Sequence, residues 1–123
     1  MYHQCIQDYL KKDYELYKGR SYYLTREFIN DETGDPIDIT GWLVTLTIKR
    51  EQEDPDADAV LIKDADLEPI DGKAVIKIQA NTLNGIDPDD YYYDISYRTD
   101  LNKVGLLQKG RSVIKNAIRR QVP

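Results

Sequence analysis

The sequence predicts an all-β fold, a two-sheet antiparallel β-sandwich of about seven or eight short strands. From Tyr14 onward, apolar and polar residues alternate with a period of two, as in strands that bury one face. Clusters of Gly, Pro, Asn and Asp interrupt this alternation roughly every 8 to 15 residues, at the spacing of turns. The strand patterns do not alternate with helix patterns, as they would in a parallel α/β sheet. An up-and-down barrel is the alternative all-β arrangement.

The length of 123 residues fits one domain, which we divide into an N-terminal arm, residues 1–13, and a β-sandwich, residues 14–123. The arm has apolar residues at helical spacing, namely Ile6, Tyr9 and Leu10. A helix this short needs a surface to pack on, so we expect a short helical or extended arm that lies against the domain or a neighbour. Cys5 is the only cysteine, which excludes a disulfide within the chain.

The first half of the predicted sandwich has two strand patterns, in residues 14–29 and 42–49, separated by the turn-rich segment 31–36. The second pattern is the more regular, and its apolar face consists of Trp42, Val44, Leu46 and Ile48. The turn before it is formed by Pro36, Asp38, Thr40 and Gly41. Pro36 restricts the backbone, the Asp38 and Thr40 side chains can bond to backbone N–H groups, and Gly41 permits the bend that directs Trp42 inward. We interpret this turn as a device that sets strand register.

In the second half, we expect strands in residues 60–63, 73–80, 91–98, 106–109 and 111–120, with Gly110 separating the last two. The segment DPDDYYY, residues 87–93, places Tyr91 at the start of a strand. In immunoglobulin-like domains a tyrosine in this place, the tyrosine corner, bonds back to the upstream backbone. Tyr91 is our candidate for that corner, and Tyr93 is expected to enter the core. A half-buried aromatic strand without a corner is the alternative.

No residue pattern points to catalysis or to a cofactor. The closest calcium-binding pattern is the D-x-D-x-D spacing of Asp54, Asp56 and Asp58, but Ala59 and Ala65 stand where an EF-hand loop has Gly and Glu. A looser calcium site would need further carboxylates, those of Asp87, Asp89 and Asp90. One histidine and one cysteine, His3 and Cys5, are too few for a zinc site in a single chain. We therefore expect no enzyme activity, no cofactor and no metal.

A carbohydrate-binding module is the alternative function, because exposed aromatic side chains on a β-sandwich can form a platform for a sugar. The candidate platform residues are Tyr2, Tyr9, Tyr17, Tyr22, Tyr23, Trp42 and Tyr92. Exposure of these side chains beside the acidic loops would favour a sugar site, and their burial would count against it.

Nucleic-acid binding is not expected, because the net charge of −5 is acidic. No apolar run has the roughly 20 residues of a membrane span.

Charge is distributed unevenly along the chain. Residues 103–123 contain six basic residues and no acidic one, so the other 11 basic and all 22 acidic residues lie in residues 1–102. Such a division can draw copies of the chain together or attract a partner. It can equally mean that a basic last strand pairs with acidic neighbours inside the domain. The residues that we expect to contact partners are Ile6, Tyr9, Leu10, Lys109, Arg111, Lys115, Arg119 and Arg120.

The order of short motifs from about residue 14 to 120 resembles an immunoglobulin-like module of tailed-bacteriophage tail and baseplate proteins, found at the N-terminus of baseplate upper proteins. Each motif is degenerate, and the resemblance lies in seven of them occurring in order. They are residues 16–19 (LYKG), 34–41 (GDPIDITG), 71–73 (DGK), 81–83 (NTL), 91–95 (YYYDI), 106–110 (LLQKG) and 119–120 (RR). The sequence departs from the pattern at Asp89 and Asp90, where many such modules have glycine before the tyrosine.

The resemblance implies a structural protein of a phage or prophage virion that acts through protein–protein contacts in the tail or baseplate. It implies other tail or baseplate proteins as partners, a homo-oligomer, and assembly in the host cytoplasm. From the charge and the lack of a long apolar run, we expect no binding to nucleic acid or membrane. A bacterial protein without a phage connection is a further alternative.

Overall fold

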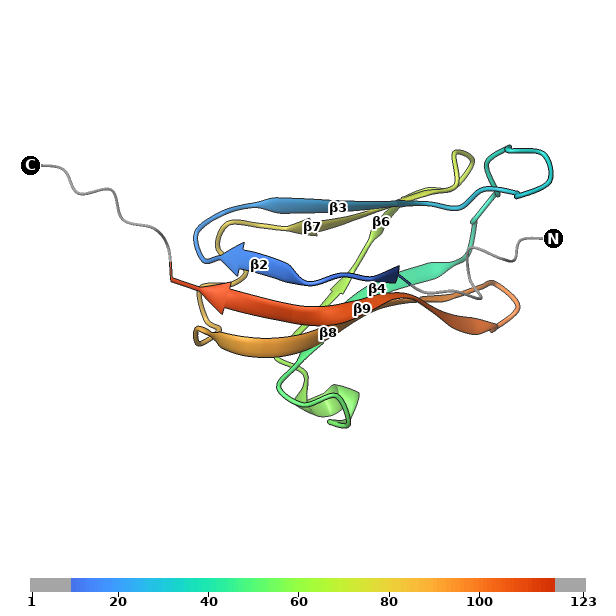
Figure 1. Cartoon of the computed structure of the whole chain (residues 1–123). Helices are drawn as coiled ribbons and strands as arrows, with labels where there is room; N and C mark the ends of the chain where they lie inside the picture. The colour runs from blue at the N-terminus through green and yellow to red at the C-terminus, as the bar shows by residue number, and fades with distance from the viewer. Residues whose placement is uncertain (1–9, 117–123) are drawn as a thin grey trace, which may run out of the picture.

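The computed structural model describes residues 10–116, which form two β-sheets packed face to face (Figure 1). This arrangement confirms the predicted all-β sandwich. The strands are β1 (Leu10–Lys11), β2 (Tyr14–Tyr17), β3 (Tyr22–Glu27), β4 (Leu43–Lys49), β5 (Leu61–Asp64), β6 (Asp66–Glu68), β7 (Lys73–Ile78), β8 (Asp89–Arg98) and β9 (Val104–Lys115). Among the described residues, the one helical element is the 3₁₀ turn η2 (Asp56–Asp58).

The larger sheet has the strand order β1-β9-β8-β4-β5, with β2 also paired to β9, and the smaller sheet has the order β3-β7-β6. This is the strand arrangement of an immunoglobulin-like sandwich. Strands β4, β8 and β9 correspond to strands C, F and G, and β5 corresponds to the C′ strand that variable-type domains add. Strands β3, β7 and β6 correspond to B, E and D.

Three details differ from the sequence-based expectations. The described residues contain nine strands rather than seven or eight: β1 lies within the predicted arm, the pattern 14–29 forms two strands in different sheets, β2 and β3, and β6 is a short strand that we did not expect. The pairing of β1 and β2 with β9 is parallel, whereas we expected an antiparallel sandwich throughout. Gly110 does not separate two strands, because β9 runs continuously through it. A methyl group at Gly110 would lie 2.0 Å from the carbonyl oxygen of Lys12, so this glycine permits a close approach of the N-terminal segment.

The core consists of the inward-facing side chains of both sheets, and the four residues of the apolar face of 42–49 are all buried in it. At one end of the sandwich, three aromatic rings from different elements meet. The Trp42 ring lies 5.1 Å from the Phe28 ring in an edge-on arrangement and 5.7 Å from the Tyr97 ring in a stacked one, centroid to centroid. Because Phe28 follows β3 and Tyr97 belongs to β8, this cluster joins the two sheets.

The tyrosine-corner hydrogen bond is present. The hydroxyl of the fully buried Tyr91, near the start of β8, donates to the backbone carbonyl of Asp87 at 2.6 Å. The Arg50 side chain covers the Tyr91 ring, with its guanidinium carbon 5.4 Å from the ring centroid. Burial raises the pKa of the Tyr91 phenol. The corner therefore ties the loop before β8 to the core.

Tyr93 enters the core as expected and belongs to a polar network there. The amide Nε2 of the fully buried Gln108 donates to the hydroxyls of Tyr14 and Tyr93, each at 2.8 Å. The Tyr93 hydroxyl in turn donates to the Lys12 carbonyl. Burial raises the pKa of Tyr93 to about 12, so the phenol stays protonated as a donor. The network connects β8 and β9 to the N-terminal segment.

The turn at residues 36–41 is stabilised mainly by Asp38. Its carboxylate oxygen Oδ1 accepts hydrogen bonds from the backbone N–H of Thr40 at 3.0 Å and from the Thr40 hydroxyl at 2.5 Å. We expected the Thr40 hydroxyl to accept a hydrogen bond from a backbone N–H group. In the structure it donates to the Asp38 carboxylate instead. Gly41 has φ of +84°, a conformation that favours glycine, and Trp42 follows it into the core.

We predict that the Asp38 carboxylate makes a pH-dependent contribution to the free energy of unfolding. The hydrogen bonds from Thr40 lower the pKa of Asp38, so its ionised form favours the folded state. This contribution is complete above the ordinary carboxyl pKa of about 3.9 and is lost as the pH falls through the lowered pKa of the folded state. Asp38→Ala should therefore reduce the free energy of unfolding at pH 7, and the difference from wild type should be smaller at about pH 3, below the ordinary carboxyl pKa. Urea unfolding at both pH values measures this difference.

The control for this prediction is Thr40→Val, which removes the hydroxyl donor and keeps the backbone one. It should cost less stability than Asp38→Ala at pH 7. A loss for Asp38→Ala that is equally large at both pH values would contradict the role of the ionised carboxylate.

Candidate functional site

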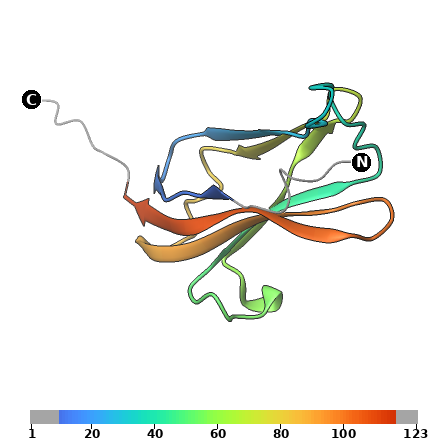
Figure 2. The ribbon, with the colours of Figure 1, turned by 45° about the vertical axis from the view of Figure 1, so that its right-hand side comes forward.

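The surface of the larger sheet that faces away from the smaller sheet is the candidate binding surface. We call it the outer face. The strands β9, β8, β4 and β5 form it with the side chains that alternate with their core residues. The loop between β4 and β5, which contains η2, projects on the side away from β3 and β7 (Figures 1 and 2). This loop therefore adds side chains to the rim of the outer face.

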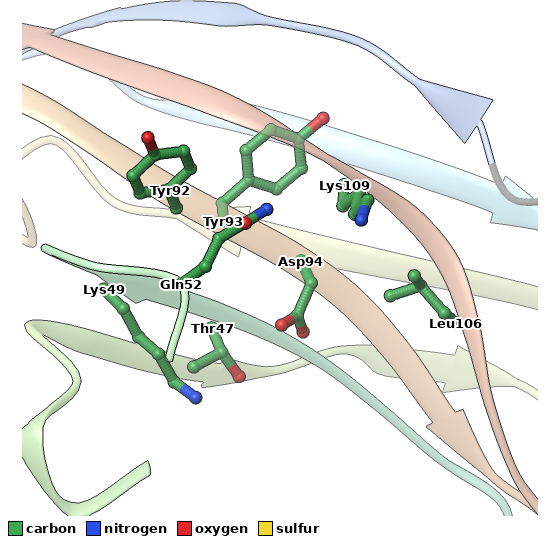
Figure 3. Close-up of a pocket in the computed structure, with 8 residues that line it drawn as sticks. All are labelled: Thr47, Lys49, Gln52, Tyr92, Tyr93, Asp94, Leu106 and Lys109. Atoms are coloured by element: carbon green, nitrogen blue, oxygen red, sulfur yellow. The ribbon is translucent and has the colours of Figure 1, made fainter. Parts of the chain in front are cut away.

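A hollow of about 230 Å³, which we call the central hollow, lies on the outer face. Figure 3 shows the side chains around it, which come from β4, β8, β9 and the β4–β5 loop. The residues that line it are Thr47, Lys49, Gln52, Tyr92, Tyr93, Asp94, Leu106 and Lys109, and of these Tyr93 directs its ring into the core. The strand register explains why they meet, because Thr47 pairs with Asp94, Lys49 with Tyr92, and Asp94 with Lys109. Three strands thus place one carboxylate and two ammonium groups in the same hollow.

Asp94 is the acidic group of the central hollow. Its side chain is partly buried, and this burial raises the pKa of its carboxyl group. The positive charges of Lys49 and Lys109 act in the opposite direction and lower that pKa. The Lys49 ammonium also lies 2.9 Å from the Asp56 carboxylate in η2. Two basic and two acidic side chains therefore balance one another in and around the hollow.

A second hollow, of about 350 Å³, shares Thr47 with the first and extends along the outer face toward the β8–β9 turn. Its lining is more aliphatic and includes Leu43, Ile62 and Val104. Ile62 is 52% exposed and Val104 is 72% exposed, so two of these side chains present apolar surface to solvent. Charged residues of the same sheet, Asp64 and Arg98, also line this hollow.

The structure brings only some of the predicted partner-contact residues to the outer face. Lys109 lines the central hollow, and Arg111 lines a smaller hollow on the other side of Tyr92. Lys115 instead lies at the end of β9 beside β2, and the backbone of Leu10 pairs with β9. The candidates outside the described residues are Ile6, Tyr9, Arg119 and Arg120.

The basic side chains of β9 pair with acidic side chains of neighbouring strands in the same domain. The Arg111 guanidinium lies 3.2 Å from the Asp90 carboxylate, and the Lys115 ammonium lies 2.9 Å from the Glu15 carboxylate. Hydrogen bonds from Tyr17 and Lys115 lower the pKa of Glu15, and Glu15 raises the pKa of Lys115. For these two basic residues, the geometry favours pairing within the domain over attraction between copies.

Most of the aromatic candidates for a sugar platform are engaged elsewhere. Trp42 is buried in the core, and the Tyr22 hydroxyl accepts a hydrogen bond from the backbone N–H of Tyr17. Tyr23 is 62% exposed but projects from the smaller sheet, far from the acidic loop. Tyr92 is half-buried beside the central hollow. Tyr2 and Tyr9 lie outside the described residues. Among the candidates that the structure describes, Tyr92 is the one that is partly exposed and lines the central hollow.

Four of the six carboxylates considered for calcium are paired with basic side chains. The Arg50 guanidinium lies 3.5 Å from the Asp89 carboxylate and 3.9 Å from that of Asp87, while Asp56 pairs with Lys49 and Asp90 with Arg111. Within residues 10–116, no group of three or more acidic, histidine or cysteine side chains is placed to hold a metal ion. His3 and Cys5 lie outside this part of the chain.

Sequence reasoning did not predict the central hollow. Asp94 and Lys49 are 45 residues apart in the chain, and their meeting depends on the register of three strands. The available signal was alternation: Thr47, Lys49, Tyr92 and Asp94 all occupy outward positions of regular strands.

The fold and the outer face together define an immunoglobulin-like β-sandwich with a polar hollow and exposed aliphatic side chains on one sheet. Searches against protein-family models and against curated proteins found no match to this chain. None of the described residues belongs to a helix long and apolar enough to cross a membrane.

Proposed function

We propose that this protein is a non-enzymatic structural protein of a tailed-phage or prophage virion, a tail or baseplate module that acts through protein–protein contacts. Its partners are other tail or baseplate proteins and further copies of the chain, and it assembles in the host cytoplasm. The order of motifs in the sequence and the immunoglobulin-like fold both support this role. The fold alone is compatible with many functions.

The observation that carries the proposal is the aliphatic surface of the outer face. Ile62 of β5 is 52% exposed and Val104 of β9 is 72% exposed, and Leu43 of β4, which is partly exposed, lines the same second hollow. Charged side chains line the same hollow, among them Asp64 and Arg98. An apolar centre with a charged rim is the arrangement of protein–protein interfaces.

Absolute mass measurement by size-exclusion chromatography with light scattering tests the homo-oligomer. We expect a defined oligomer at about 50 mM salt, and any contribution from exposed charge pairs should weaken at about 500 mM, because salt screens them. Val104→Glu and Ile62→Glu should each raise the dissociation constant at least about tenfold, since each buries a charge in the contact. Ile70→Glu is the matched control, because Ile70 is 73% exposed but lies in the turn before β7.

A strict monomer at both salt concentrations and at high protein concentration would contradict self-association. An equal effect of Ile70→Glu would contradict the assignment of the contact to the outer face. The virion role has its own test, mass spectrometry of purified phage particles from a strain that encodes the chain. The protein should be present in the particles in many copies, and its absence from them would overturn the role.

A further inference from the structure

We propose that the central hollow binds a single uncharged saccharide ring or a closely similar polyhydroxyl ligand. This binding is separate from the assembly function proposed above.

The size of the hollow sets the first limit on its ligand. Pockets that hold drug-sized molecules have volumes of roughly 300 to 1,000 Å³. The central hollow, at about 230 Å³, is smaller and open to solvent on the outer face. It therefore suits one ring-sized unit rather than an extended ligand.

The hydrogen-bonding groups set the second limit. The Asp94 carboxylate can accept hydrogen bonds from two adjacent hydroxyl groups, and the Lys109 ammonium and the Gln52 amide can donate to hydroxyl or ring oxygens. Thr47 provides a hydroxyl at the floor, where it is 8% exposed. A ligand with several neighbouring hydroxyl groups can bond to the Asp94 carboxylate and to the Gln52 amide at the same time.

The walls and the charge set the third limit. Tyr92 and Leu106 provide apolar surface on opposite sides of Asp94, suited to the C–H face of a sugar ring. The Arg111 guanidinium, 5.3 Å from the centroid of the Tyr92 ring, helps to hold that ring in place. Lys49 and Lys109 are balanced by Asp94 and Asp56, so neither an anionic nor a cationic ligand has an electrostatic advantage. An uncharged ligand fits this balance.

The test is a titration of the ¹⁵N-labelled full chain, followed by two-dimensional ¹H–¹⁵N NMR. The probes are glucose, galactose, N-acetylglucosamine and rhamnose, with glucuronate as the charged counterpart. We expect at least one of the four uncharged sugars to produce saturable shifts at the amides of Thr47, Tyr92, Asp94 and Lys109. The dissociation constant should lie in the millimolar range, because a single ring makes few contacts.

Two pairs of variants make the test specific. Asp94→Asn and Tyr92→Ala should each weaken binding about tenfold or more, the loss expected for a charge-assisted hydrogen bond or an apolar wall. Asp71→Asn is the control for the first, because Asp71 is an exposed carboxylate in the turn before β7, outside both hollows. Tyr23→Ala is the control for the second, because Tyr23 is an exposed tyrosine of the other sheet. Both controls should bind as wild type does.

The absence of saturable shifts with all four uncharged sugars would overturn the proposal. Binding that Asp94→Asn and Tyr92→Ala leave unchanged would also overturn it, provided that their spectra show a folded protein. Tighter binding of glucuronate than of glucose would refute the preference for an uncharged ligand. None of these outcomes bears on the oligomer or on the presence of the protein in virions, which are measured separately.

Discussion

Replacing Trp42 with alanine is expected to lower the free energy of unfolding by about 3 to 5 kcal/mol, the usual cost of truncating a buried tryptophan. Trp42 is 7% exposed, and its ring lies against those of Phe28 and Tyr97. Its removal leaves a cavity between the two sheets and breaks two aromatic contacts, because the three rings come from different parts of the sandwich. Proteins of this size have a total stability of roughly 5 to 15 kcal/mol, so this loss threatens folding itself.

Urea unfolding followed by circular dichroism measures the effect. Trp42→Phe is the conservative variant, which keeps a ring in the cluster and should cost clearly less than alanine. Tyr23→Ala removes an exposed aromatic side chain of the smaller sheet and should change stability by less than about 0.5 kcal/mol. A cost below about 1 kcal/mol for Trp42→Ala would show that the cluster does not hold the sheets together.

Gly110→Ala is expected to reduce the free energy of unfolding by about 1 to 3 kcal/mol, the range for forcing extra volume into a packed site. An alanine Cβ would lie 2.0 Å from the Lys12 carbonyl oxygen and 2.9 Å from Oδ1 of Asp13. The segment between β1 and β2 would have to move away from β9. This movement would disturb the hydrogen bond from the Arg111 N–H to Asp13 and the one from the Tyr93 hydroxyl to Lys12.

Gly85→Ala is the matched control, because no atom lies within 4 Å of the position that its Cβ would occupy. It should leave stability unchanged or raise it by up to about 1 kcal/mol, since alanine restricts the unfolded chain more than glycine does. Hydrogen exchange locates the effect. In Gly110→Ala the amides of Lys12 and Arg111 should exchange faster, while those of the smaller sheet should keep their protection. Equal stability of Gly110→Ala and wild type would contradict the close approach.

The fold class could be predicted from local patterns in the sequence, namely the alternation of apolar and polar residues in strands and the residues that form turns. A strand with one buried face must alternate with period two, so Trp42, Val44, Leu46 and Ile48 could be assigned to the core without a structure. Turn chemistry is local in the same sense. The Asp38 side chain bonds to the backbone two residues later, and the Tyr91 hydroxyl bonds to the backbone four residues earlier. The Asp38 bond could be expected from local turn chemistry, whereas the Tyr91 bond was one of two alternatives that the structure decides.

Properties that depend on strand pairing could not be read from the chain. Gly110 resembles a strand break in sequence, and only the approach of Lys12, almost a hundred residues earlier, shows why glycine is needed within a continuous strand. The parallel pairing of β2 with β9 likewise depends on where the N-terminal segment lies. The basic residues of β9 suggested contacts between copies, yet Arg111 and Lys115 pair within the domain because β8 and β2 flank that strand.

The central hollow is the clearest case of the difference between what the local sequence predicts and what strand pairing decides. The sequence by itself determined that Lys49, Asp94 and Lys109 belong to strand patterns, because polarity alternates locally along each strand. Only the tertiary structure decided that β4, β8 and β9 are neighbours, in a register that gathers these three side chains around one hollow. Strand alternation is a property of consecutive residues. Sheet order and register arise from packing both sheets around one core, and no single segment of the chain contains them.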